Sequence, residues 1–214
     1  MERLWFWLAT VTCFLVFKPA LSGHEAGLVA YSMSDVERAR FEFLSGSELG
    51  DPRSQYMLGL IHDRGLSVRR DPVEAIKWYR LAANQGHALA QYMLGLIHNS
   101  GFDAVTRARS NAVRVGGAAA TPSQRLGIAY VEALRWLTLA AEQGLPQAQY
   151  SLGLMYATGS GVPADFVAAH FWWTIAVGSG SDQASKKLSL LEGLMSEDSL
   201  QKARRLSRER GGLR

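Results

Sequence analysis

Apolar and small residues recur along the chain with the spacing of helices that each bury one face. Ala75, Trp78, Tyr79 and Ala82 stand at i, i+3, i+4 and i+7, which is the stripe of an amphipathic α-helix. Before such stripes the sequence places aspartate followed by proline, which is typical of a helix N-cap and first turn. After them it places a glycine, which is typical of a helix end. The pattern therefore predicts an all-α chain.

Two sequence blocks recur in register along the chain. The block that begins at Gln55 returns 36 residues later at Gln91 and a further 58 residues later at Gln149. The block that begins at Glu74 returns after 58 residues at Glu132, with a weaker third copy before Gly180. The unit is therefore 36 residues long, and the middle unit carries an insertion of 22 residues.

Each copy of the first block contains a glycine in the interior of its predicted helix, at positions 59, 95 and 153. Glycine in a helix interior lowers helix propensity by about 1 kcal/mol relative to alanine. We therefore interpret these glycines as packing residues that let two helices approach closely.

The repeated blocks resemble the Sel-one-like repeat family, a relative of the tetratricopeptide repeats. The family unit reads roughly A-x-x-L-G-x-x-Y, a G-x-G-V loop, D-x-x-x-A-x-x-W-Y, and A-A-x-x-G. The last unit has this loop as Gly159-Ser160-Gly161-Val162, the first lacks the second loop glycine, and the middle one has the insertion in its place. The resemblance covers roughly residues 24–180. It implies a right-handed α-solenoid of helix-turn-helix repeats and an adaptor or scaffold role more often than catalysis.

The register of the repeats divides the chain into segments. We expect a signal peptide at 1–22, a degraded repeat at 23–50, a repeat at 51–86, a repeat at 87–144 with a flexible basic insertion at about 102–124, a repeat at 145–180, and C-terminal capping helices at 181–214. In the last segment, Leu200, Ala203 and Leu206 form a short apolar stripe. We expect this stripe to dock on the preceding helix, roughly Asp182 to Met195, because a repeat array needs a cover over its last apolar face.

The N-terminal segment has the three parts of a secretory signal. Arg3 is followed by the uncharged run from Leu4 to Phe17, and small residues precede a cleavage point near Ser22. The sequence thus favours an exported bacterial protein, periplasmic or secreted, with an inner-membrane anchor retained at the N-terminus as the alternative. The single cysteine, Cys13, lies inside this segment, so the remainder of the chain can form no disulfide.

The net charge of +4 is unevenly distributed. The insertion carries arginines at 107, 109, 114 and 125 against one aspartate, and the C-terminal tail is also basic. Either the insertion is tolerated with its arginines in water, or it tethers an acidic partner or a membrane surface. Nucleic acid is not an expected partner, and membrane contact through the basic C-terminal helix is the less favoured alternative.

Candidate partner-binding residues come from the aromatic positions and from the insertion. Trp78, Trp136 and Trp172 recur with the repeat and are assigned to the inter-helix core. Their neighbours are expected to reach a groove and to anchor a partner, as are three arginines of the insertion. The predicted partner-binding residues are Tyr79, Phe171, Trp173, Arg107, Arg109 and Arg114.

The sequence offers no constellation for catalysis or for a metal, so we expect a protein without a cofactor. Some cysteine-rich members of the resembled family bind or hydrolyse β-lactams, and this chain lacks their cysteine pairs. The favoured function is therefore non-catalytic: a scaffold or regulator outside the cytoplasm that binds a protein partner of unknown identity through the solenoid groove. A β-lactam enzyme and a membrane-surface protein remain the alternatives.

Overall fold

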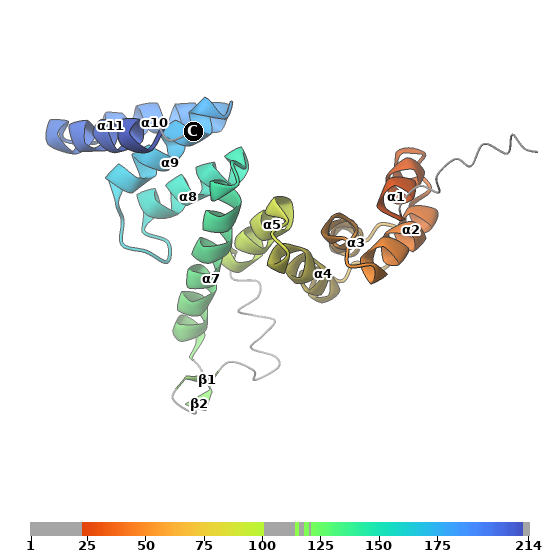
Figure 1. Cartoon of the computed structure of the whole chain (residues 1–214). Coiled ribbons are helices and arrows are strands. Elements are labelled where there is room, and N and C mark those ends of the chain that lie inside the picture. Colours follow the sequence, from red (N-terminus) through yellow and green to blue (C-terminus); the bar gives the residue numbers. More distant parts are fainter. Residues whose placement is uncertain (1–22, 101–113, 116–117, 120, 212–214) are drawn as a thin grey trace, which may run out of the picture.

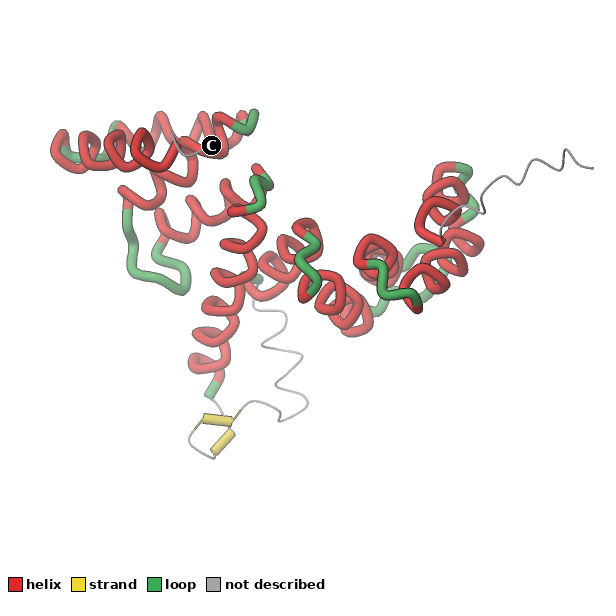
Figure 2. The backbone as a smooth tube through the Cα atoms, viewed as in Figure 1, coloured by secondary structure: helices red, strands yellow, loops and turns green. Residues whose placement is uncertain are grey.

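The computed structural model describes residues 23–100, 114–115, 118–119 and 121–211. Figure 1 shows an elongated array of helices with α1 and α2 at one end and α10 and α11 at the other. The elements are α1 (Gly23–Ser32), α2 (Val36–Glu48), α3 (Pro52–Arg64), α4 (Pro72–Asn84), α5 (Ala88–Asn99), β1 (Arg114–Val115), β2 (Ala118–Ala119), α7 (Pro122–Glu142), α8 (Pro146–Thr158), α9 (Phe166–Gly178), α10 (Asp182–Glu192) and α11 (Glu197–Gly211). Figure 2 shows how completely helices dominate the described chain. The predicted all-α solenoid of helix-turn-helix repeats is confirmed.

The aspartates and glycines that recur in the sequence set the helix ends. Asp71 caps α4 by accepting hydrogen bonds from the backbone N–H groups of Val73 and Glu74, and Asp165 caps α9 in the same manner. Gly86, Gly144 and Gly180 follow the second helix of their repeats with φ of 87°, 86° and 86°. Only glycine adopts this left-handed conformation at little cost, so the chain can turn sharply into the next helix.

The two helices of each repeat meet at a glycine. An added Cβ on Gly59, Gly95 or Gly153 would lie 2.5 Å from Tyr79, 2.5 Å from Leu137 or 2.3 Å from Trp173. Gly27 of α1 meets Phe43 of α2 at 2.4 Å in the same way. The glycines are therefore packing residues, as their positions predicted, and residues 23–50 have the construction of a repeat.

Buried glutamines link each repeat to its neighbours. Gln91 Oε1 accepts a hydrogen bond from Gln143 Nε2 at 2.7 Å, within its own repeat. Its Nε2 donates to Ala83 O at 3.1 Å, at the end of the preceding repeat. Gln55 and Gln85 form the equivalent intra-repeat bond at 2.7 Å. Because an unsatisfied buried amide costs about 1–3 kcal/mol, these bonds favour a single arrangement of the helices.

Helical structure resumes after the insertion a few residues earlier than predicted. Residues 122–124 were expected to be flexible, but α7 begins at Pro122, and Thr121 and Gln124 form a capping box at its start. At 21 residues, α7 is longer than α4 and α9, which have 13 each. Figure 1 shows its N-terminal part projecting from the array, with the antiparallel pair β1–β2 near its tip.

The C-terminal helices extend the array in two different ways. α10 packs on α9 as the first helix of another repeat would, with Ala184 and Leu191 buried at the expected register positions. The stripe of α11 was expected to dock on α10, but α11 packs mainly against α9. Ala203 is fully buried in this contact. The stripe is too short to specify its partner helix from the sequence alone.

Candidate interaction surface

Leucines occupy one repeated register position on the first helices of successive repeats. Each comes directly after the glycine that faces the second helix of its repeat, so its side chain points about 100° away from that contact. Leu28 is 39% exposed, and Leu60, Leu96 and Leu154 are half-buried. Leu89, 40% exposed, adds to the same side of α5. We call these five leucines on α1, α3, α5 and α8 the first-helix face.

Charged side chains lie at the N-terminal end of the first-helix face. Arg53 contacts Asp51 at 3.1 Å and Glu25 at 3.7 Å, and His24 Nδ1 lies 3.8 Å from Asp51 Oδ2. Burial opposes ionisation of Asp51, but hydrogen bonds from Ser54 and Arg53 outweigh it and lower the pKa of the carboxyl group. Burial is also the main reason that the pKa of His24 is lowered, with Arg53 adding to it. This corner therefore combines an ionised aspartate with a neutral histidine at pH 7.

A stacked pair of rings supports the junction between α3 and α5. The rings of Tyr56 and His87 have centroids 4.9 Å apart, and the His87 side chain accepts a hydrogen bond from Ala90 N as the N-cap of α5. Burial lowers the pKa of His87 and raises that of Tyr56. Both rings are thus neutral at pH 7, which suits a structural role.

A groove of about 1080 Å³ lies between α9, α10 and α11. At its base the buried His170 contacts Glu192 Oε1 at 2.9 Å through Nε2 and Thr174 Oγ1 at 3.3 Å through Nδ1. Glu192 also lies 3.7 Å from Arg204 of α11. These contacts connect the three C-terminal helices, and the geometry gives them a structural role.

Neither a metal centre nor a membrane span is found in the parts of the chain that the structure describes. No three His, Cys, Asp or Glu side chains there are grouped so that they could hold a metal ion. Within the same residues, no helix combines the length and the apolar character needed to cross a bilayer.

The aromatic residues predicted to bind a partner are buried. Tyr79, Trp173 and Phe171 are 0%, 3% and 6% exposed. Tyr79 and Trp173 fill the space over Gly59 and Gly153, and Phe171 lies on α9, which has α11 as an additional neighbour. The interpretation of these three as exposed anchors is therefore corrected: they pack inside the array.

The insertion carries the other three predicted partner-binding residues. Arg107 and Arg109 lie outside the described residues, and of Arg114 the structure gives only its backbone in β1. Their role as partner-binding residues stays a prediction.

The first-helix leucines were not predicted from the sequence, although the repeat contains a signal for them. Leu60, Leu96 and Leu154 follow the repeated glycine in every copy of the first block. Once that glycine is assigned to the helix contact, the next residue must point away from it.

Comparison with known proteins gives the chain its family context. The Sel1 repeat family model matches residues 52–87, 88–114, 129–145 and 146–181, which together make up more than half of the chain. A solved Sel1 repeat protein from Oxalobacter formigenes is 29% identical, with a TM-score of 0.54, and the match covers 71% of this chain and 98% of that one.

Curated relatives include fungal regulators that are much longer. "Chitin synthase regulator SKT5" of Malassezia restricta is 29% identical over 79% of this chain and 10% of its own length. "Chitin synthase regulatory factor 3" of Schizosaccharomyces pombe is 28% identical over 74% of this chain and 15% of its own. SKT5 of Saccharomyces cerevisiae is 28% identical over 79% and 22%. The chain therefore spans less than a quarter of the length of these relatives.

These relatives overturn the expected localisation. The prediction of a bacterial protein that is periplasmic, secreted or held by an inner-membrane anchor is wrong, because the three curated relatives come from fungi. The segment that carried the prediction, 1–22, lies outside the described residues.

Proposed function

Because the chain belongs to the Sel1 repeat family, we propose that it is a non-catalytic scaffold or regulator that binds a protein partner through the first-helix face. The observation that carries this proposal is the repeat-periodic row of partly exposed leucines, from Leu28 on α1 to Leu154 on α8. Apolar side chains repeated at one register position make a continuous contact surface, whereas scattered ones do not.

The names of the curated relatives support a regulatory role. Each is a regulator or regulatory factor of an enzyme, and each matches this chain over most of the chain's length. The shared segment is a repeat array, so we infer that its contribution is to hold a partner protein. A partner segment on the first-helix face would bury leucine side chains, each contributing up to about 1.5–3 kcal/mol when fully covered.

Substitutions on α5 test the proposal. The double variant Leu89→Glu and Leu96→Glu places two charges in the middle of the first-helix face. In cross-linking and affinity capture from the native cell, partners held by this face should be lost from the variant by at least tenfold. The matched control is Gln147→Glu on α8, which is exposed like Leu89 and at the same register position, but is already polar. Equal capture by the wild type and the α5 variant would refute the role of this face.

A further inference from the structure

Three second helices, α4, α7 and α9, carry a mainly apolar stripe on the side that faces away from their first helices. It consists of three positions at i, i+4 and i+8, which lie along one side of a helix. These positions are Val73, Lys77 and Leu81 on α4, Val131, Arg135 and Leu139 on α7, and Val167, Phe171 and Ile175 on α9. We call the three positions on each helix its outer stripe.

On α9 the outer stripe is covered by another helix of the same chain. Phe171 is only 6% exposed, and Val167 and Ile175 are half-buried. α9 packs against α11 in addition to α8 and α10, and Ala203 of α11 is fully buried. The packing of α11 on α9 thus shows that an outer stripe can bind an amphipathic helix.

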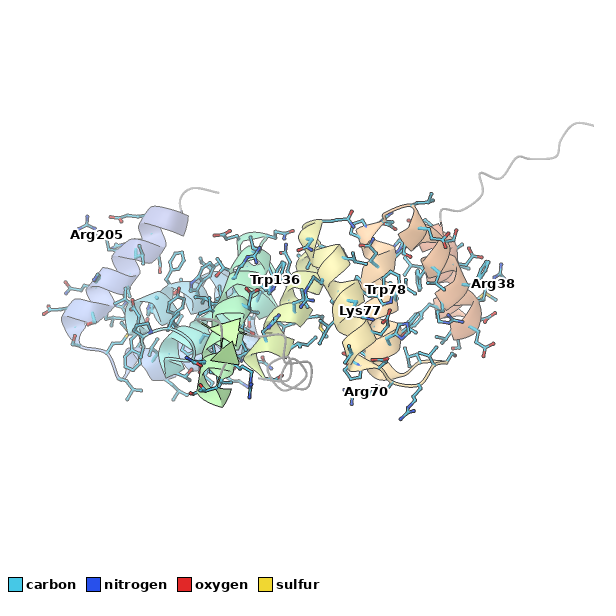
Figure 3. The ribbon with its side chains drawn as sticks, turned by 90° about the horizontal axis from the view of Figure 1, so that it is seen from below. Arg38, Arg70, Lys77, Trp78, Trp136 and Arg205 are labelled. Atoms are coloured by element: carbon cyan, nitrogen blue, oxygen red, sulfur yellow. The ribbon has the colours of Figure 1, made fainter. Side chains whose placement is uncertain are left out.

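On α4 and α7 the same stripe is open. Val73 and Leu81 are 50% and 48% exposed, and Val131 and Leu139 are 60% and 36% exposed. Single exposed apolar residues are common on protein surfaces, but four at equivalent positions of adjacent repeats form a pattern. Figure 3 labels Lys77 on α4 and Trp136 on α7, the second helices of adjacent repeats.

The middle of each open stripe is cationic, where α9 has phenylalanine. Lys77 Nζ lies 2.7 Å from Glu74, and Arg135 lies 3.8 Å from Glu132 and 4.9 Å above the ring of Trp136. Both cations are exposed, and exposed ion pairs of this kind contribute about 0–1 kcal/mol. A carboxylate on a partner can therefore replace the present one at little cost.

The surroundings of α4 add positive charge. Arg69 and Arg70 precede the helix and are exposed, and Arg80 lies one turn after Lys77. Arg70 pairs with Asp63 at 3.6 Å. A helix with acidic residues beside a narrow apolar stripe matches this surface in both shape and charge.

We propose that the outer stripes of α4 and α7 bind an amphipathic helix of a partner protein, with a narrow apolar stripe like that of α11 and acidic residues along its edges. The site is separate from the first-helix face and does not depend on it. The apolar stripe of the partner helix contacts the valine and leucine positions, and its carboxylates contact Lys77 and Arg135.

A peptide derived from α11 tests this site. The probe is a fluorescent peptide of residues 197–211 with Lys202→Glu, Arg205→Glu and Arg208→Glu, titrated with the whole protein by fluorescence anisotropy. We expect saturable binding that is at least tenfold tighter than that of the unaltered basic peptide and that weakens as salt is raised. Adding Leu200→Ser and Leu206→Ser to the probe should abolish binding.

Variants of the protein locate the peptide. Lys77→Glu combined with Arg135→Glu should weaken binding at least tenfold, whereas Lys77→Arg combined with Arg135→Lys should leave it within twofold. Leu89→Glu combined with Leu96→Glu should also leave it unchanged, which separates this site from the first-helix face. Circular dichroism checks that each variant is folded. The proposal is overturned by absence of saturable binding, by equal binding of the acidic and basic peptides, or by equal binding to the wild type and the Lys77→Glu, Arg135→Glu variant.

Discussion

The first and last complete repeats of the array share one internal contact and differ on their outer side. In α1–α2 the ring of Phe43 packs on Gly27, and in α8–α9 the ring of Trp173 packs on Gly153. Outside that contact, Phe41 of α2 is 68% exposed, whereas Phe171 at the same register position of α9 is 6% exposed. The register of a repeat therefore fixes what its two helices bury together, but not what covers them.

The difference between the two ends is due to α11. α2 packs between α1 and α3, while α9 has α8, α10 and α11 as neighbours. The two middle repeats place Lys77 and Arg135 at the position of these phenylalanines, as suits an open surface.

Removal of α11 should have the largest effect. Truncation after Met195 exposes Phe171 and Val167, and we expect a loss of about 2–4 kcal/mol, the range for exposing a large apolar side chain and its neighbour. Differential scanning calorimetry measures the loss, and Arg205→Ala in the whole chain is the control, expected to stay within about 0.5 kcal/mol. An unchanged melting temperature after truncation would show that α11 does not cover α9.

Substitution of the packing glycine in the last repeat should destabilise the fold. Gly153→Ala adds a Cβ 2.3 Å from the buried Trp173, and we expect a loss of about 1–3 kcal/mol from the forced repacking. Gly127→Ala is the matched control, because nothing lies within 4 Å of a Cβ added there. It should stabilise α7 by about 0.5–1 kcal/mol through helix propensity. Urea unfolding measures both, and two shifts of the same sign would contradict the packing role.

The last repeat has an unfilled hydrogen bond that a substitution can supply. Gln149 is fully buried, and its Oε1 has no hydrogen-bond partner among the described residues, since Ser179 stands where the earlier repeats have Gln85 and Gln143. Ser179→Gln should therefore donate to Gln149 and stabilise the fold by about 1 kcal/mol. Thermal unfolding measures the gain, which should vanish when Gln149→Leu is added. A gain that persists in that background would have another origin.

Acidic pH should destabilise the N-terminal half of the array, because His24 and His87 there favour the neutral form. The pKa of His87 and that of His24 are lowered in the folded chain, so folding favours the neutral rings. Their contribution is fully present above pH 6.5, the ordinary histidine value, and is lost as the pH falls toward the lowered pKa. Hydrogen exchange of α1–α5 should quicken modestly between pH 7 and 5 after correction for intrinsic rates. His87→Asn, which keeps an N-cap, should reduce the effect, and no reduction would point to other groups.

The sequence predicted the internal order of the repeats well. The unit length, the helix caps and the packing role of Gly59, Gly95 and Gly153 all follow from residues whose local conformation or size has a single strong reason. Such features depend on contacts within one repeat.

Features that depend on several helices were harder to predict. Trp78 and Tyr79 are adjacent and both lie on a broad apolar face, and the position of Gly59 on the facing helix decides that Tyr79 is the fully buried one. The bonds of Gln91 join three helices and cannot be seen in one repeat. The packing partner of α11 was predicted wrongly for the same reason. A stripe of three residues can pack on more than one neighbouring helix, and the sequence does not distinguish α9 from α10.

The same substitution at the two ends tests the central claim most directly. Phe41→Lys and Phe171→Lys each introduce the type of residue that the middle repeats carry at this register position. Because only Phe171 is covered, its replacement should cost about 3 kcal/mol or more in the free energy of unfolding, while the replacement of Phe41 should change it by less than about 0.5 kcal/mol. Equal losses in urea unfolding would contradict the account, since they would mean that α11 does not distinguish the last repeat from the first.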